Sequence, residues 1–194
     1  MPDAGLAARW RARLDALPVP HLPRVGVVWA GGNSGIAVDG LRSLAAAQIA
    51  PLLALRNVRW ISLQKTDDPT KRADATISAR LVDWTDEITD FADTAALIDN
   101  LDLVIAVDTS VAHLAAALGK PVWLLNRFAG CWRWLHGRDD SPWYPGLRLF
   151  TQPQRGDWDD VLARVAAALQ QRFPLPDGAS RNQHAALVPP VGQP

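Results

Sequence analysis

The sequence predicts an α/β fold built on an open, doubly wound and mostly parallel sheet. Residues 103–107 form an apolar run without polar alternation, which is typical of a strand buried on both faces. A helix-compatible stretch follows and ends at Gly119, and a second buried strand begins at 121–125. Such an order predicts two parallel strands joined by a right-handed crossover. The same alternation continues along most of the chain, which extends the unit to a whole sheet.

The elements before this unit follow from turn signals and hydrophobic runs. Residues 6–16 are compatible with a helix, and three prolines between 18 and 23 then interrupt the chain. The elements expected next are a strand at 25–29, a glycine-rich loop at 31–35, a helix at 41–55, a strand at 58–63, a polar irregular stretch at 64–80, a short strand near 81–82 and a helix at 94–100 that leads into the strand at 101–107.

The elements after the 122–125 strand are a long segment at 126–147 rich in Trp, Arg and Pro, a strand at 147–151 and a closing helix at 157–173. We expect three parts: an N-terminal helix and linker at 1–23, one Rossmann-like domain at 24–173 and a disordered tail at 174–194. The tail is predicted from its five prolines and its lack of hydrophobic periodicity. A chain of 194 residues is long enough for one domain with a sizeable core.

Composition excludes several classes of protein. Lys plus Arg equals Asp plus Glu at 20 each, whereas a nucleic-acid or membrane-surface protein needs a basic excess. Cys131 is the single cysteine, so an internal disulfide and a multi-cysteine metal site are excluded and a reducing cytoplasm is favoured. No apolar stretch approaches the roughly 20 residues of a membrane span, and no secretory signal begins the chain. We expect a cytoplasmic protein.

Seven of the nine tryptophans fall into two groups. Three lie in apolar runs and are expected in the core: Trp29, Trp60 and Trp123. Four lie among Gly, Pro, Arg and Asp residues and are expected to brace loops: Trp132, Trp134, Trp143 and Trp158. One of these four could instead serve as a stacking platform for a base or a sugar ring.

Ligands of a doubly wound sheet bind outside the carboxyl ends of its strands. Four segments follow those ends here: Gly31-Gly32-Asn33-Ser34, Gln64-Lys65, Asp108-Thr109-Ser110 and Asn126-Arg127. Free amides and small hydroxyl groups at a helix start make an anion site, above all for phosphate. The glycines allow backbone amides to approach a phosphate, and Lys65 is a candidate counter-charge.

Two readings of the 108–113 segment remain open at this point. In the first, the helix start binds a phosphate and His113, one helical turn on, reaches the same ligand. In the second, this is an ordinary crossover and His113 is a half-buried helix residue. The glycine patterns of nicotinamide, flavin and ATP loops are absent, so those ligands are disfavoured.

A series of motifs resembles the heptosyltransferase-like glycosyltransferases. Residues 108–122 read DTSVAHLAAALGKPV and resemble the signature of that family, in the version that follows tetratricopeptide repeats in bacterial proteins. Further pieces occur in the same order: RVGVVWAG at 24–31, RSL at 42–44, SLQK at 62–65, DFADTAALI at 90–98, WRW at 132–134 and DSPWYP at 140–145. The resemblance covers residues 7–173.

The resemblance implies the carboxyl-terminal, nucleotide-sugar-binding half of a two-domain GT-B glycosyltransferase. By position, the donor diphosphate would be held by Asp108, Thr109, Ser110, Val111 and His113. The loop with Gly31, Gly32, Asn33 and Ser34 would face the same phosphates. Because helix amides and a histidine can stabilise a diphosphate leaving group, neither a metal nor a cofactor is expected.

The chain departs from the family pattern in two loops. Ile36 and Val38 stand where the family usually has His and Asn, and residues 126–134 replace a segment that often reads Pro-x-x-Pro-Asp-Trp-Arg-Trp. These losses suggest an altered donor choice or lost activity. No catalytic residue is assigned.

Two functions are therefore carried forward. The first is the donor-binding half of a glycosyltransferase, whose acceptor domain lies amino-terminal to it in the family and is missing from this chain. The chain alone is then expected to bind a nucleotide diphospho-sugar without transferring the sugar. The second is a non-catalytic module that keeps the half-fold for binding or self-association. The donor nucleotide, the sugar and the acceptor are not predicted.

Overall fold

The computed structural model describes residues 1–19, 21–32 and 38–175. Its sheet has six strands in the order β3-β2-β1-β4-β5-β6, and all neighbouring strands pair in parallel. The strands are β1 (Arg24–Val28), β2 (Arg59–Ser62), β3 (Leu81–Val82), β4 (Leu103–Val107), β5 (Val122–Asn126) and β6 (Leu147–Thr151). The predicted α/β, doubly wound parallel sheet is confirmed.

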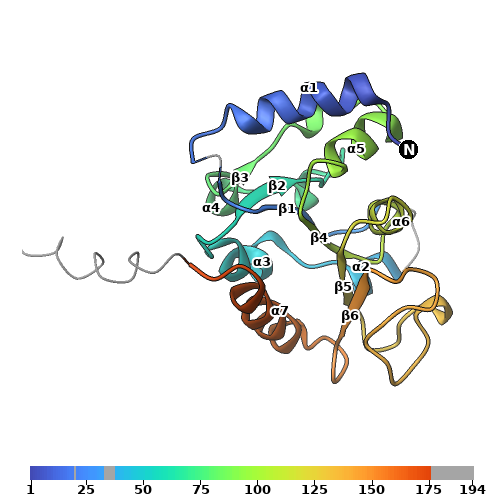
Figure 1. The fold of residues 1–194 in the computed structure, drawn as a ribbon. Coiled ribbons are helices and arrows are strands. Elements are labelled where there is room, and N and C mark those ends of the chain that lie inside the picture. Colours follow the sequence, from blue (N-terminus) through green and yellow to red (C-terminus); the bar gives the residue numbers. More distant parts are fainter. Residues whose placement is uncertain (20, 33–37, 176–194) are drawn as a thin grey trace, which may run out of the picture.

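Helices cover both faces of the sheet. They are α1 (Ala4–Asp15), α2 (Val38–Arg42), α3 (Ala46–Leu53), α4 (Ala75–Ser78), α5 (Phe91–Ile98), α6 (Ser110–Ala117) and α7 (Trp158–Arg172), with short 3-10 turns at Pro69–Lys71, Thr85–Glu87 and Trp132–Trp134. Figure 1 shows α1 and α5 on one side of the sheet and α3 and α7 on the other. No described helix is long and apolar enough to cross a membrane.

The central strand β4 explains why the sheet needs both helical layers. All five of its residues are buried. Leu103 and Ile105 face the core under α3 and α7, whereas Val104 and Ala106 face the core under α1, α5 and α6. Since successive side chains of a strand point to opposite faces, an uninterrupted apolar run requires cover on both sides.

Helix α1 is packed onto the domain rather than extended from it. Trp10 is fully buried and stacks on Trp84, with 5.7 Å between the ring centroids. Arg13 lies over both rings and forms two hydrogen bonds to the Glu87 carboxylate, of 2.5 and 2.8 Å. Arg9 is 2.8 Å from the Asp93 carboxylate at the start of α5. Helix α1 thus completes the core on the α5 side of the sheet.

Several expected elements have different bounds in the structure. The helix expected at 41–55 is divided into α2 and α3, because the amide of Leu44 donates a hydrogen bond of 2.8 Å to the Trp29 carbonyl and draws the chain toward the end of β1. The polar stretch at 64–80 contains a 3-10 turn and α4, which are capped by Asp68 and Asp74. Helix α5 begins before residue 94, because Asp90 caps it.

The tryptophans follow the sequence predictions in part. Trp29, Trp60 and Trp123 are buried as expected, and so are Trp134 and Trp158. Trp158 begins α7 instead of bracing a loop. Trp143 is exposed, yet its indole donates a 2.9 Å hydrogen bond to the Arg133 carbonyl, whereas Trp132 is 72% exposed and braces little.

Candidate functional site

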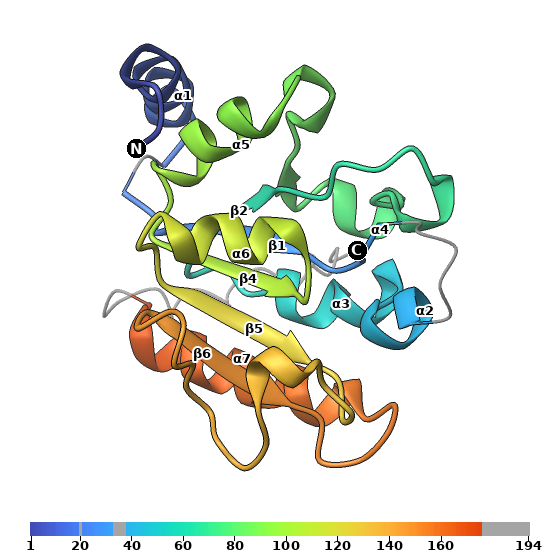
Figure 2. The ribbon, with the colours of Figure 1, turned by 90° about the vertical axis from the view of Figure 1, so that its right-hand side faces the viewer.

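The carboxyl ends of the six strands meet at one edge of the sheet. In Figure 2 the arrowheads of β4 and β5 point toward the side of the molecule where α2 lies. The strand order reverses between β1 and β4, which are hydrogen-bonded neighbours in the middle of the sheet. This reversal is the topological switch point, where open α/β sheets place their ligands.

A cavity of about 400 Å³ opens at this point. It is lined by segments that follow β1, β2 and β4 and by the start of α5. Six residues that the sequence singled out line it together: Gly32, Gln64, Lys65, Thr109, Ser110 and Val111. Asp108 and His113 do not line this cavity, and Asn33 and Ser34 lie outside the described residues.

The amino end of α6 is open toward the cavity. Three other long helices have their first amides bonded by an aspartate: Asp3 caps α1, Asp90 caps α5 and Asp157 caps α7. Thr109 occupies the same position before α6 but makes no side-chain capping bond. Its Oγ1 atom is buried and has no hydrogen-bond partner among the described residues. The first amides of α6 therefore keep their capacity to bind an anion.

A guanidinium group ties together the two loops that flank the switch point. Arg42 Nη1 donates a hydrogen bond of 2.7 Å to the Asp108 carbonyl, and Arg42 Nη2 lies 2.5 Å from the Asp39 carboxylate. Ser43 Oγ accepts a 3.0 Å hydrogen bond from the Gly31 amide and donates one of 2.6 Å to the Asp39 carbonyl. The loop after β1 is thereby fixed against the loop after β4.

Gln64 is hydrogen-bonded within the protein as well as lining the cavity. Its side chain is buried, and its Oε1 accepts hydrogen bonds from the amides of Trp29 and Ala30, of 3.1 and 2.9 Å. Its Nε2 donates a 3.1 Å hydrogen bond to the Ala30 carbonyl. The amide group is thus used to hold the end of β1, and only the edge of the residue borders the cavity.

Lys65 is likewise engaged within the protein. Its Nζ donates hydrogen bonds of 3.1 and 2.6 Å to the carbonyl oxygens of Thr85 and Ile88. Its ammonium group has no carboxylate partner among the described ion pairs. The positive charge therefore remains at the border of the cavity, but two of its three donors point at backbone carbonyls.

His113 lies in an aromatic cluster on the other side of the α6 start. Its ring stacks on Trp134, with 5.2 Å between centroids and 16° between planes. His113 Nδ1 and the Tyr144 hydroxyl group share a hydrogen bond of 3.1 Å, and His113 Nε2 lies 3.6 Å from Asp108 Oδ1. The histidine therefore joins α6 to the segment at 132–146.

The environment of Asp108 favours its ionised form. Burial of the Asp108 carboxyl group raises its pKa, but the neighbouring His113 imidazole, Trp134 indole and Arg133 guanidinium together hold that pKa below its usual value. A carboxylate beside the start of α6 would repel a phosphate. Its negative charge is directed to His113, away from the cavity lining.

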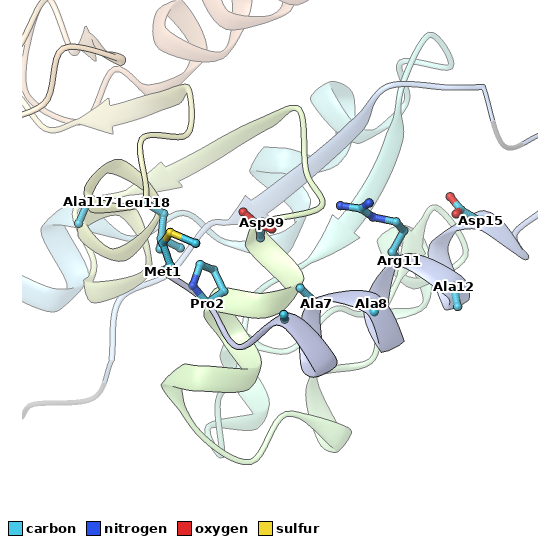
Figure 3. A pocket seen from close by; sticks show the side chains of 11 residues that line it. Met1, Pro2, Ala7, Ala8, Arg11, Ala12, Asp15, Asp99, Ala117 and Leu118 are labelled. Atoms are coloured by element: carbon cyan, nitrogen blue, oxygen red, sulfur yellow. The ribbon is translucent and has the colours of Figure 1, made fainter.

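A larger cavity, of about 670 Å³, lies at the opposite edge of the sheet. Figure 3 shows Met1, Pro2 and Ala7 of the α1 segment facing Asp99 and Leu118, which follow α5 and α6. Both helix ends precede the amino ends of strands β4 and β5. Size alone therefore does not locate the candidate site, because this cavity lies away from the edge of the sheet at which ligands bind.

Comparison with known proteins identifies the fold. The E. coli ADP-heptose LPS heptosyltransferase II matches with a TM-score of 0.56 over 89% of this chain and 53% of its own, at 16% identity. The fold is that of half a heptosyltransferase. A second structure, a family 9 glycosyl transferase from Veillonella parvula DSM 2008, matches with a TM-score of 0.53 over the same shares at 10% identity. The chain spans about half the length of each.

Sequence comparison agrees with this heptosyltransferase fold. Residues 87–125 match the model of glycosyltransferase family 9 (heptosyltransferase). Protein FlbA of Caulobacter vibrioides is 32% identical over 174 residues, which are 87% of this chain and 28% of FlbA. The matched family segment holds α5, β4, α6 and all but the last residue of β5, and so contains the Asp108–His113 region.

The sequence interpretation did not assign the contacts of three residues that hold the segments around the candidate site. Arg42 and Ser43 were recognised only as part of the RSL motif, yet they bind the Asp108 carbonyl and the Gly31 amide. Tyr144 was recognised only within DSPWYP, yet it bonds His113. The only sequence signal for these residues was their place in the ordered series of motifs. Their hydrogen-bond partners are distant in sequence, so the contacts could not be read from local spacing.

Proposed function

We propose that this chain is the carboxyl-terminal, donor-binding half of a GT-B glycosyltransferase and binds a nucleotide diphospho-sugar in the cavity before α6. The supporting observation is the uncapped start of α6, where the buried Thr109 hydroxyl oxygen has no described partner, at the switch point of a heptosyltransferase-like sheet. Amides and a hydroxyl group in this position suit a diphosphate.

The cavity offers separate surroundings for the two parts of a nucleotide. The diphosphate would lie against the α6 amides, Thr109, Ser110 and the Gly32 backbone. The base would occupy the apolar part of the lining, which includes Leu63, Ile88 and the exposed ring of Phe91. Fixed amide dipoles stabilise charge as it develops on a leaving diphosphate, which is the contribution expected from this half of a transferase.

The acceptor belongs to another part of the enzyme in this proposal. The chain covers 53% of each solved heptosyltransferase-like structure, so a second domain, linked or assembled, would complete the cleft. Holding the two substrates together supplies roughly 7–11 kcal/mol in good cases. The association with tetratricopeptide repeats and the cytoplasmic location expected from the sequence remain part of the proposal.

A non-catalytic binding module is the second candidate. The observation that favours it is that two side chains expected to bind the donor are already engaged: Lys65 donates to two carbonyl oxygens, and His113 is held by Tyr144 and Trp134. A module of this kind would bind the nucleotide or a protein without supporting transfer. The two candidate functions can be distinguished by supplying a partner domain, because only the glycosyltransferase half would then transfer a sugar.

The test is a thermal-shift titration of the full chain with UDP, GDP and ADP and with a sugar derivative of each. At a concentration one hundred times its dissociation constant, the correct nucleotide should add about 2.7 kcal/mol to the free energy of unfolding. Absence of a shift with every nucleotide at millimolar concentration would rule out donor binding. Transfer of radiolabelled sugar should appear only with an added acceptor domain.

A further inference from the structure

A second cavity, of about 470 Å³, lies at the carboxyl ends of β5 and β6. We propose that it binds a neutral sugar, whose hydroxyl group donates a hydrogen bond to the side-chain amide of Asn126. The proposal goes beyond the nucleotide site, because none of the residues lining this cavity lines the cavity before α6. It rests on the proposed glycosyltransferase function only for the sugar's role as a substrate.

Asn126 provides the polar centre of the cavity. It is the last residue of β5 and is only 3% exposed. Its Nδ2 donates a 3.1 Å hydrogen bond to Thr151 Oγ1, its partner in register on β6, whereas its Oδ1 has no hydrogen bond within the described structure. A buried amide with one unused polar atom destabilises the folded chain, and a ligand hydroxyl group would satisfy that atom.

Gly130 packs closely on the side-chain amide of Asn126. A Cβ atom at position 130 would lie 2.8 Å from both Nδ2 and Oδ1 of Asn126. Any other residue would press on the amide or displace it. The loop thus passes closely over Asn126, and both residues line the same cavity.

The remaining lining suits an uncharged ligand with apolar faces. The Phe128 ring is 45% exposed, and Leu135 is exposed beside the same cavity. Arg138 forms two hydrogen bonds to the Asp140 carboxylate, of 2.5 and 2.7 Å, and Asp139 lies 3.8 Å from Arg148. Because the charges of Arg138 and Asp139 are paired, the cavity offers one amide, one hydroxyl group, the His136 imidazole and an aromatic face. A pyranose ring presents hydroxyl groups and C–H faces that match these groups.

The loop that closes the cavity is anchored independently of any ligand. The Leu149 amide of β6 donates a 2.7 Å hydrogen bond to the Asp139 carbonyl, and Asp140 pairs antiparallel with Arg148. The loop therefore returns along the outer edge of β6 and keeps its wall in place. This makes the cavity a largely preformed site, which lowers the ordering cost of binding.

The experiment is an amide NMR titration of the full ¹⁵N-labelled chain with methyl α-D-glucopyranoside, methyl α-D-mannopyranoside, methyl β-D-galactopyranoside and N-acetylglucosamine. We expect saturable shifts at Gly130 and at the Asn126 side-chain NH₂ with one of these probes. Phe128→Ala should weaken that binding about tenfold or more. Phe91→Ala, which removes a similarly exposed ring from the nucleotide cavity, should leave it unchanged. Asn126→Ala should abolish it in a chain whose folding is verified by its amide spectrum.

Two results would overturn the inference: no saturable shift with any probe, or equal shifts in the wild type and Phe128→Ala. A parallel titration with UDP, GDP and ADP separates this outcome from failure of the proposed function, because nucleotide shifts would appear at Gly32 and Ser110. If a methyl glycoside shifts the Gly130 resonance while a nucleotide is already bound, the cavity binds an acceptor sugar.

Discussion

Arg42 Nη1 donates a hydrogen bond of 2.7 Å to the backbone carbonyl oxygen of Asp108. This bond joins the end of α2 to the end of β4 across the switch point of the sheet. The same guanidinium is paired with Asp39, whose backbone carbonyl accepts from Ser43. The loops that would surround a nucleotide are therefore fixed to each other by the protein itself.

Gly31→Ala should break this arrangement. A Cβ atom at position 31 would lie 2.6 Å from Arg42 Nε, and the guanidinium is too firmly bonded to move freely. We expect a loss of about 1–3 kcal/mol in the free energy of urea unfolding, typical of an overpacked site. The matched control is Gly40→Ala in α2, where a Cβ meets no atom within 4 Å. Equal stability of the two variants would contradict the role given to Arg42.

Tyr144→Phe should loosen the segment at 132–146 from α6. The change removes the hydroxyl group that is hydrogen-bonded to His113 Nδ1 and keeps the ring. We expect a loss of about 0.5–1.5 kcal/mol in the free energy of unfolding, together with shifted ring resonances of His113. If neither the stability nor the histidine resonances change, the hydrogen bond does not hold the segment. His113→Ala should cost more, because it also removes the stacking on Trp134.

Asp108 should make folding stability sensitive to acid. Its pKa lies below the usual value of 3.8, so its ionised form contributes stability above that value, and the contribution is lost as the pH falls through the lowered pKa. The difference in unfolding free energy between the wild type and Asp108→Asn should therefore shrink on acidification into this range. Urea unfolding from neutral to acidic pH measures it. A difference that is independent of pH would argue against the ionised Asp108.

Trp10→Ala should show that α1 is part of the folding unit. Trp10 is fully buried and stacks on Trp84, so its removal should cost about 3–5 kcal/mol in one cooperative transition. The comparison variant is Arg9→Ala, which removes a partly exposed ion pair with Asp93 and should cost at most about 1 kcal/mol. An early separate transition for α1, or similar costs for the two variants, would make α1 an appended helix.

The fold could be predicted from the sequence because its strongest signals are local. The run at 103–107 is apolar at every position, and this pattern by itself requires cover on both faces of the strand. The switch-point segments could also be predicted, since parallel strands bring their carboxyl ends to one edge. The division of the 41–55 region into two helices could not, because it depends on the bond from Leu44 to the Trp29 carbonyl, which is formed only in the folded chain.

The directions of the polar side chains in the candidate site could not be predicted from the sequence. Gln64 and Lys65 occupy the expected edge, yet both bond to backbone groups of other segments. A long polar side chain hydrogen-bonds to an unsatisfied backbone carbonyl or amide within its reach. Which backbone group lies within reach depends on the tertiary structure. For the same reason the sequence could not place the ring of His113, one of the expected site residues, which lies with Trp134 and Tyr144.

The central claim is that the start of α6 and the Gly32 backbone hold a nucleoside diphosphate. The most direct test is isothermal titration of the wild type and Gly32→Ala with UDP, GDP and ADP. Among the residues that the structure describes, no atom lies within 4 Å of a Cβ at position 32, so the variant should keep the wild-type stability while the methyl group obstructs the phosphate. We predict that one nucleotide binds the wild type and binds Gly32→Ala about tenfold or more weakly. Equal affinity for both proteins, or no binding of any nucleotide at millimolar concentration, would contradict the claim.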